Sequence, residues 1–225
     1  MPRFLLPLLL LLPAIQPAHL LLADDADDAK PVVTKPVADK AGWLTLFDGK
    51  TLDGWKVSDF AGHGDPRVDD GKIILPFGSD MTGITWLGKV FKDDYEVELD
   101  AMRVDGVDFF CALTFPVKED PCTLICGGWG GGVVGLSSIN GMDASENSTS
   151  SYREFKKGQW YHIRVKVADG RIRAWVDKEP VVDFEIRDNR ISIRPEVEHS
   201  KPLGVATWCT TGALKNIRLR SLQDD

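Results

Sequence analysis

The sequence has little of several features that would point to a particular class of function. Acidic side chains outnumber basic ones, 34 to 27, for a net charge of −7 over 225 residues. This balance argues against nucleic acid or an anionic membrane surface as the main partner, because both attract basic proteins. The Lys-Ser/Thr signature of a phosphate loop is missing, as is a Ser or Cys nucleophile motif. Beyond the first residues no sustained helical period occurs, so strands are the main expected structure.

Cysteine is scarce, and the four present leave two interpretations open. They are Cys111, Cys122, Cys126 and Cys209. Export would permit disulfides, and four cysteines allow three full pairings between which the sequence does not choose. Buried free thiols are the alternative. A structural zinc is disfavoured, because Cys122 and Cys126 have no histidine and no second cysteine pair near them.

The first residues have the composition of an export signal. Arg3 precedes an apolar run from Phe4 to Ala23 that carries no Asp, Glu, Lys or Arg. This pattern predicts a secretory signal peptide over residues 1–23, cleaved after Ala23 or, as the alternative, after Ala18. An uncleaved anchor is the other interpretation, but the prolines and small residues favour cleavage. We therefore expect a periplasmic, cell-surface or extracellular protein without an integral membrane domain after cleavage.

A compositional change then separates a linker from a folded domain. Residues 24–41 are rich in Asp, Ala, Lys and Pro and have almost no large apolar side chain, which is typical of a disordered linker. One folded domain is expected over residues 42–222, with residues 223–225 as a tail. A domain of this size buries about 70% of its extended-chain surface, which is enough for one core.

Short alternating runs, separated by Gly, Pro, Asp and Asn, predict a β-rich domain. We expect strands at Leu44–Phe47, Lys72–Leu75, Ile84–Trp86, Tyr95–Arg103, Asp108–Phe115, Thr123–Ile125, Gly132–Ser137, Trp160–Val167, Arg171–Val176, Val181–Ile186, Leu203–Thr207 and Leu214–Leu222. About a dozen short strands with few or no helices predict an all-β fold, a two-sheet antiparallel β-sandwich of the jelly-roll type.

The stretch from Trp160 to Asp177 predicts a hairpin in detail. Two alternating runs meet at Asp169-Gly170, and Asp-Gly is a strong signal for a two-residue turn. Counting outward from that turn gives one apolar face, which should lie in the core. Its members are Ile163, Val165, Val167, Ile172, Ala174 and Val176.

The other face of this hairpin carries side chains that could bind and cleave a sugar. The count places His162 opposite Asp177 and Arg164 opposite Trp175. We expect His162 to act as acid and base, with Asp177 orienting its ring. Arg164 would anchor a carbonyl or hydroxyl group, and Trp175 would stack on the sugar. The alternative is an ordinary solvated sheet face.

The segment Cys126 to Ser151 is the second candidate for binding. Five glycines surround Trp129, which indicates positive φ angles or close backbone approach. Asp143, Glu146 and Asn147 follow in a turn-rich loop, where their oxygens could bind vicinal sugar hydroxyls. The same oxygens make a calcium ion possible, although no cofactor is required. A packed glycine-rich crossing with Trp129 in the core is the alternative.

Three carboxyls alternate in YEVELDAM and so share one face of one expected strand. They belong to Glu96, Glu98 and Asp100. Some retaining glycosidases use such a row, with two carboxyls about 5–5.5 Å apart. The order of the acids here does not match the Glu-x-Asp-x-Glu pattern, so a solvated outer face is the favoured interpretation.

The opening LFDGKTLDGW and the closing KNIRLRSL, around a hairpin of the type QWYHIRVKV…RIRAWVD, resemble the 3-keto-disaccharide hydrolase domain family. The resemblance covers residues 42–222 and implies an exported bacterial protein with a concanavalin-like, laminin-G-like jelly roll. It also implies a carbohydrate ligand and hydrolase or lyase chemistry on glycosides oxidised at C3. The glycine-rich middle segment departs from the family pattern. A non-catalytic carbohydrate-binding or cell-surface interaction module therefore stays open as the alternative.

Overall fold

The computed structural model describes Met1 and residues 38–223. Apart from Met1, the expected signal peptide lies outside the described residues, and so do residues 24–37 of the expected linker. The last two residues of the expected tail do so as well. Among the described residues, no helix has the length and apolar character needed to cross a bilayer.

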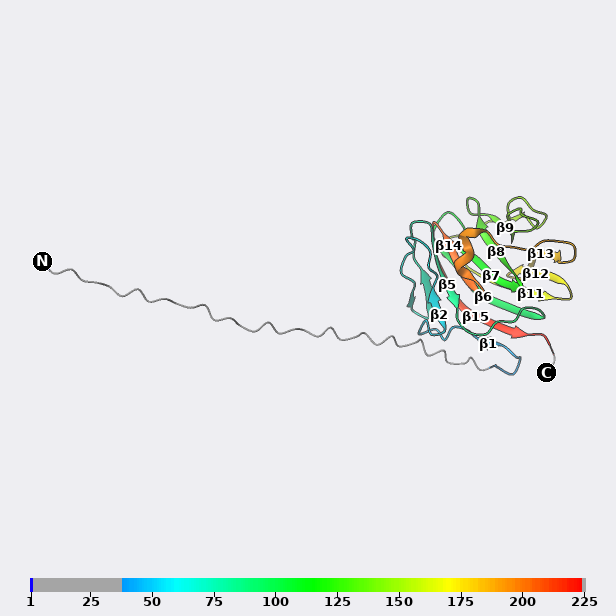
Figure 1. The fold of residues 1–225 in the computed structure, drawn as a ribbon, viewed down its shortest axis with the longest axis horizontal. Coiled ribbons are helices and arrows are strands. Elements are labelled where there is room, and N and C mark those ends of the chain that lie inside the picture. The colour runs from blue at the N-terminus through cyan, green and yellow to red at the C-terminus, as the bar shows by residue number, and fades with distance from the viewer. Residues whose placement is uncertain (2–37, 224–225) are drawn as a thin grey trace. The chain divides into compact units, whose positions relative to one another are not determined.

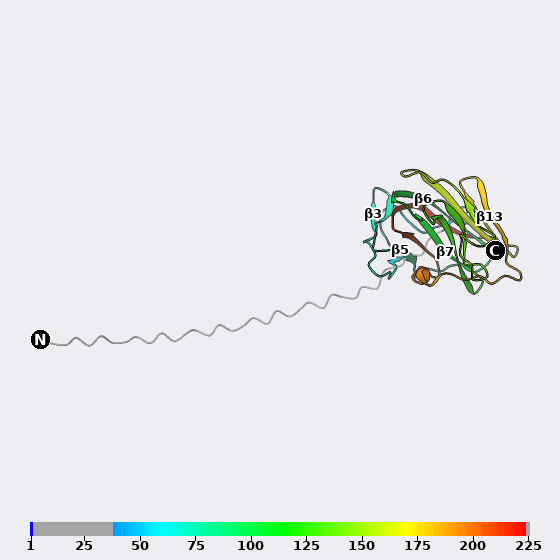
Figure 2. The same cartoon turned by 90° about the horizontal axis from the view of Figure 1, so that it is seen from above.

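Residues 38–223 form two antiparallel sheets that pack face to face, so the predicted all-β sandwich is confirmed (Figure 1). The eight-stranded sheet has the order β13 (Glu179–Glu185), β12 (Arg171–Val176), β11 (Trp160–Ala168), β6 (Tyr95–Gly106), β15 (Thr210–Ser221), β4 (Lys72–Leu75) and β3 (Arg67–Asp69), with β1 (Leu44–Thr45) also paired to β15. The seven-stranded sheet has the order β10 (Ser151–Tyr152), β9 (Val133–Ser137), β8 (Asp120–Gly128), β7 (Cys111–Val117), β14 (Gly204–Trp208), β5 (Met81–Trp86) and β2 (Trp55–Val57). One 3₁₀ turn, η1 (Pro195–Ser200), lies on the β5 and β7 side in Figure 2.

The hairpin β11–β12 has the predicted register. Ala168 pairs with Arg171 across the Asp169-Gly170 turn, and both turn residues have positive φ, +57° and +67°. The six apolar side chains predicted for its inner face are all fully buried between the sheets. Burying each aliphatic side chain contributes about 1.5–3 kcal/mol, so this face alone is a large part of the core.

The opening segment closes one side of that core. Leu46, Phe47 and Trp55 are buried in it, and the Trp55 indole N–H donates to the Leu46 carbonyl at 2.7 Å. Trp43 is buried elsewhere, on the outer face of the eight-stranded sheet. Its ring lies 4.4 Å from the Arg220 guanidinium, measured from the ring centroid.

The seven-stranded sheet is covered on both faces. Its outer face carries small side chains such as Ala112 and Ala206. They belong to a second apolar cluster, in which Phe60 and, from the η1 turn, Val197 also pack. All seven residues of β7 are buried as a result. Small residues under a partial cover leave room for a hollow on this face.

Several strands differ from the predicted ranges. β8 starts at Asp120, because Pro121 lies directly opposite Pro116 and the ladder continues past both prolines. The strands β2, β3 and β10 were not expected. Each has two or three residues, which is too short to show an alternating pattern.

The structure resolves the cysteine alternatives in favour of free thiols. All four are unpaired, and Cys111, Cys122 and Cys126 are buried while Cys209 is partly exposed. Burial raises the pKa of Cys122 and of Cys126 to about 12 and that of Cys111 well above its ordinary value. Desolvation also raises the pKa of Cys209. Because the thiolate is the reactive form, the three buried thiols should be inert.

In the native protein at pH 8, we therefore expect one slowly reacting thiol in titration with Ellman's reagent, and four after unfolding in guanidinium. Cys209→Ser should remove the native-state reaction. Reaction of two or more thiols before unfolding would contradict the buried arrangement.

Candidate functional site

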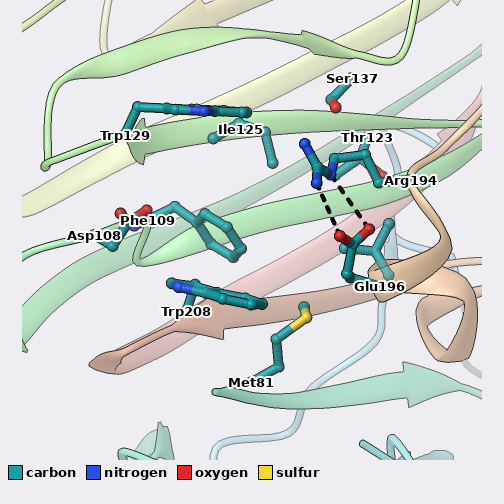
Figure 3. Close-up of a pocket in the computed structure, with 11 residues that line it drawn as sticks. Met81, Asp108, Phe109, Thr123, Ile125, Trp129, Ser137, Arg194, Glu196 and Trp208 are labelled. Carbon is teal, nitrogen blue, oxygen red and sulfur yellow. Dashed lines mark hydrogen bonds and ion pairs between the residues drawn. The ribbon is translucent and has the colours of Figure 1, made fainter. Parts of the chain in front are cut away.

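A hollow of about 270 Å³ lies on the outer face of the seven-stranded sheet (Figure 3). We call it the aromatic hollow. It is lined by Met81, Asp108, Phe109, Thr123, Ile125, Trp129, Ser137, Arg194, Glu196, Val197 and Trp208. These residues come from four strands, three loops and the η1 turn, so only the folded sandwich brings them together.

Three aromatic side chains form one end of this hollow. Figure 3 shows Phe109 between Trp129 and Trp208, with Arg194 and Glu196 at the other end. The Phe109 and Trp208 ring centroids are 6.3 Å apart, and Trp129 is 42% exposed. Partly exposed aromatic rings in a concave site offer apolar faces for a ligand, while nearby polar groups fix its orientation.

Trp129 is held by a buried arginine beneath its loop. Arg103 of β6 is only 5% exposed, and burial lowers its pKa. Its guanidinium donates to the carbonyls of Gly131 at 2.8 Å, Gly127 at 3.1 Å and Phe155 at 3.1 Å. A Cβ on Gly127 would lie 2.4 Å from this guanidinium. Close approach to Arg103 therefore explains part of the glycine-rich sequence.

The polar end of the hollow is an ion-paired cluster around Arg194. Its guanidinium donates to Glu196 at 2.8 Å and to Asp143 at 2.9 Å. The hydrogen bond with Glu196 raises the pKa of Arg194, and the same bond lowers the pKa of Glu196. Glu196 is therefore ionised at neutral pH, and the cluster presents a fixed guanidinium between two carboxylates.

Ser137 supplies an unused hydroxyl at this hollow. The residue is 2% exposed, and its oxygen has no hydrogen-bond partner among residues 38–223. A buried polar group without a partner costs about 1–3 kcal/mol. A ligand hydroxyl reaching Ser137 would remove that cost.

A second hollow of about 350 Å³ adjoins the first, and we call it the polar hollow. It is lined by Ser138, Gly141, Asp143, Glu146, Ser192, Ile193, Arg194, Pro195 and Glu196. Arg194 and Glu196 belong to the lining of both hollows.

The structure brings together three of the four residues predicted in the glycine-rich segment and its loop. Trp129 lines the aromatic hollow, while Asp143 and Glu146 line the polar hollow. The fourth residue, Asn147, was predicted to contact a ligand, but it lines neither hollow. Asn147 is buried, and its amide donates to the carbonyls of Leu136 at 2.6 Å and Asp143 at 2.7 Å, so it holds the loop in place.

The predicted pairing of the His162 ring with Asp177 is wrong. The ring Nδ1 lies 2.8 Å from Asp100 Oδ1, and Nε2 lies 3.5 Å from Glu98 Oε2. Asp177 accepts from the His162 backbone N–H and pairs with Arg153, both at 3.0 Å. The cause is β6, which pairs with the other side of β11 and places Asp100 directly opposite His162.

The outer face of the hairpin does not meet the two hollows. His162, Arg164 and Trp175 point outward from the eight-stranded sheet, whereas the hollows lie on the outer face of the other sheet. The Arg164 guanidinium stacks on Trp175 at 4.1 Å from the ring centroid. The two predicted candidate regions are therefore on opposite sides of the sandwich.

The expected solvated row of acids on β6 is also wrong. Glu96 and Glu98 are 4% and 6% exposed. Arg220 Nε donates to Glu96 at 2.9 Å and Arg218 Nε to Glu98 at 3.1 Å, because β15 places these arginines directly opposite. Trp43 covers both arginines and completes the burial. This face is a satisfied ion-pair layer.

The sequence did not predict five residues of the candidate site, which are Phe109, Ser137, Arg194, Glu196 and Trp208. None of them sits in a motif or a distinctive spacing. Their only common signal is position at strand ends or beside the η1 turn, and that position becomes visible only with the sheet order.

The described residues contain no group of three His, Cys, Asp or Glu side chains that could hold a metal ion. In the loop considered for calcium, Asp143 already accepts from Arg194 and Ser145, and the Asn147 oxygen accepts from Thr149. A calcium ion would have to replace these contacts.

The model of the 3-keto-alpha-glucoside-1,2-lyase-like domain family matches residues 42–220. No curated protein sequence matches the chain significantly.

Solved structures share the fold at low identity. A transglycosylase, Crh5, superposes with a TM-score of 0.57 at 12% identity, covering 84% of this chain and 87% of that one. A candidate glycosyl hydrolase from Parabacteroides distasonis has a TM-score of 0.51 at 16% identity, covering 84% and 100%. Domain 4 of the extracellular arabinanase AbnA from Geobacillus stearothermophilus, solved with arabinotriose, has a TM-score of 0.52 at 13% identity, covering 80% and 91%. At these identities the likeness shows the fold alone.

The His162–Asp100 contact predicts a pH-dependent contribution to stability. The hydrogen bond that His162 donates to Asp100 raises the pKa of His162. Burial alone would raise the pKa of Asp100, but hydrogen bonds from His162 and Asn216 bring it below its usual value. Because the folded-state pKa of His162 is raised, its contribution is complete below the unfolded value of about 6.5 and is lost as the pH rises through the folded value.

We expect His162→Gln to lower the free energy of unfolding at pH 5.5 by less than about 1 kcal/mol, because the ring is partly exposed, and by less at pH 9. Urea unfolding at both pH values measures this difference. His199→Gln is the control, since His199 is exposed and forms no ion pair among the described residues. An equal effect of His162→Gln at both pH values would contradict the charged pairing.

Proposed function

The chain belongs to the 3-keto-alpha-glucoside-1,2-lyase-like domain family, and from this premise we propose that it cleaves 3-keto-glycosides or related disaccharides bound in the aromatic hollow. It is a carbohydrate-active domain of the glycosyl-hydrolase-like or carbohydrate-binding kind. The observation that carries the proposal is the hollow itself, with three aromatic side chains at one end and the Arg194–Glu196 pair at the other.

Binding follows from the shapes and polarities of the lining. A sugar ring has an apolar C–H face and a rim of hydroxyls. Trp129 and Trp208 offer aromatic surface to the ring face, and Ser137 offers a hydroxyl that has no hydrogen-bond partner within residues 38–223. Arg194, held between two carboxylates, can donate to a ring hydroxyl or carbonyl.

The chemistry needs one base and one electrophile at the same place. A ketone at C3 makes the C2–H acidic. A base removes that proton, the electron pair forms the C1=C2 bond, and the bond from C1 to the anomeric oxygen breaks. The departing oxygen takes a proton, and in a hydrolase water then adds across the double bond. Glu196 is ionised and can accept the proton, while the Arg194 guanidinium stabilises the charge that develops on the C3 oxygen.

A non-catalytic carbohydrate-binding module is the second candidate. The observation that favours it is the composition of the aromatic hollow. None of its eleven lining residues is a histidine, and the Arg194 bond that keeps Glu196 ionised also makes it a weaker base.

The hairpin remains a second proposed location for catalysis. There His162 would be the acid and base, with Asp100 rather than Asp177 orienting its ring, and Arg164 and Trp175 would meet the sugar. The aromatic hollow is favoured because it is concave, whereas His162 lines neither hollow.

Two variants test the aromatic hollow. Trp129→Ala should weaken glycoside binding roughly 2- to 10-fold, because an aromatic contact contributes about 0.5–1.5 kcal/mol. Glu196→Gln should lower the rate of 3-keto-glucoside cleavage at least about 100-fold, the usual contribution of a general base, with a much smaller change in binding. Calorimetry measures the first effect, and a steady-state assay of 3-keto-glucoside cleavage measures the second.

His162→Ala is the matched control, and it should leave both quantities near the wild-type values. Glycoside binding without any cleavage by the wild-type protein would favour the binding module. Loss of cleavage in His162→Ala but not in Glu196→Gln would move the active site to the hairpin.

We also propose that the protein is exported, on the evidence of residues 1–23. Expression of the full chain in a bacterial host should yield mature protein in the periplasm or medium. Its N-terminal residue should be Asp24, or His19 if the alternative cleavage occurs, as read by N-terminal sequencing. Full-length protein retained in the cytoplasm would contradict export.

A further inference from the structure

We infer that the outer face of the β11–β12 hairpin is a docking surface for a linear anionic polysaccharide of the polyuronate type. This surface lies on the opposite side of the sandwich from the aromatic hollow. The inference goes beyond the proposed function, because it concerns a second binding surface and a second ligand. It holds whether or not a glycoside is cleaved in the hollow.

The surface is built on a strand whose outward side chains form one line. Trp160, His162, Arg164 and Lys166 alternate with the buried core residues of β11. Residues two apart in a strand are separated by about 6.7 Å, so this line is about 20 Å long. Lys215 of β15 adds its ammonium group, which lies 4.1 Å from the centroid of the Trp160 ring. We call Lys215, Arg164 and Lys166 the cation row.

The three side chains of the cation row are partly exposed, and none of them forms an ion pair or a side-chain hydrogen bond with a residue among 38–223. β11 and β12 contain no acidic residue. On β6, the other neighbour of β11, each outward acid already has a partner. These pairs are Glu96–Arg220, Glu98–Arg218 and Asp100–His162. The charge that lacks a counterion along β11 is therefore positive.

Arg164 is the best-placed cation of this row. Its guanidinium lies 4.1 Å from the centroid of the Trp175 ring. Stacking of this kind fixes the plane of a guanidinium and leaves the N–H groups at its edge free to donate. A carboxylate can accept two parallel hydrogen bonds from such an edge. Arg164 therefore presents a preorganised site for one carboxylate of a ligand.

Lys166 stands where a bound anion would be stabilising. The register of the hairpin places it directly opposite Arg173, and like charges in that arrangement are destabilising. Arg173 is compensated only by long contacts, at 3.4 Å to Asp169 and 3.5 Å to Asp183. A second carboxylate of the ligand, above Lys166, would reduce the repulsion between the two cations.

The form of the cation row indicates the kind of ligand. Trp160 and Trp175 each have a ring face covered by a cation of the protein, so this surface offers charge more than free rings for stacking. Positive groups spread over about 20 Å suit a chain with repeated carboxylates better than a single anion. A polyuronate has one carboxylate on each sugar unit, which fits a carbohydrate-active domain. Because acidic residues outnumber basic ones in the whole chain, 34 to 27, the polymer would be steered to this face.

The test measures binding of polygalacturonate to the intact protein by calorimetry in calcium-free buffer. The fully methyl-esterified polymer is the matched ligand, because it has the same backbone without the charges. We expect binding of polygalacturonate only, with an affinity that falls at least about tenfold between 20 and 300 mM NaCl as salt screens the exposed charges. Arg164→Gln and Lys166→Gln should each weaken binding about two- to fivefold, the size expected of exposed ion pairs.

Arg67→Gln is the matched control. Arg67 is exposed, lies in β3 at the far edge of the same sheet and has no ion pair in the described part of the chain, so its loss removes the same charge and should not change the affinity. Equal weakening by Arg67→Gln would overturn the cation row as the site. Equal binding of the esterified polymer or of poly-L-glutamate would overturn the anionic polysaccharide as the ligand.

Trp129→Ala separates this surface from the aromatic hollow. Polygalacturonate binding should persist in that variant, and its loss there would move the polymer to the hollow and overturn the inference. Absence of polygalacturonate binding by the wild-type protein would overturn the inference too. Neither that absence nor an effect of Arg164→Gln on this binding alters the proposed function, which is measured with glycosides and 3-keto-glucosides.

Discussion

The structure depends on one buried guanidinium that joins its two sheets. Arg103 continues the inward side of β6, after Val97, Leu99 and Ala101, so a charge stands where the next core residue would be. A buried charge is costly unless each of its N–H groups finds an acceptor. Here the guanidinium N–H groups donate to backbone carbonyls of the seven-stranded sheet, of its glycine-rich loop and of the loop after β10. Because these carbonyls belong to the segments around Trp129, the same interaction that closes the sandwich also presents the aromatic end of the site.

The outer faces of the two sheets differ in how their polar side chains are hydrogen-bonded and covered. The eight-stranded sheet neutralises its central carboxylates with the arginines of β15 and covers these with Trp43, so these central polar groups are already satisfied. The seven-stranded sheet carries small apolar residues under an incomplete cover, and its Ser137 hydroxyl has no hydrogen-bond partner in the described part of the chain. Unsatisfied polar groups beside apolar surface are what a ligand can complete, and this difference favours the second face as the site.

The polar end of the site is an assembly of distant segments. Asp143 comes from the loop after β9, and Arg194 and Glu196 come from the η1 region about fifty residues later. The ion pairs fix the guanidinium between its two acids, so the proposed substrate would meet a preorganised guanidinium. Preorganised charge of this kind is effective both for binding hydroxyls and for stabilising a developing oxyanion, which is why binding and catalysis have to be separated by experiment.

The features that the sequence alone predicted correctly depend on interactions between residues close together in the chain. The Asp169-Gly170 turn, the apolar face of β11 and β12 and the all-β sandwich follow from backbone preferences and alternation, which involve residues near one another in the chain. Partners across the sheets depend on strand order, which alternation does not encode. The tertiary structure therefore decided that His162 meets Asp100 and not Asp177, because β6 lies on the far side of β11. It also decided that Trp129 faces a hollow shared with Arg194, since contacts between residues so far apart arise only when the loops pack over the sheet.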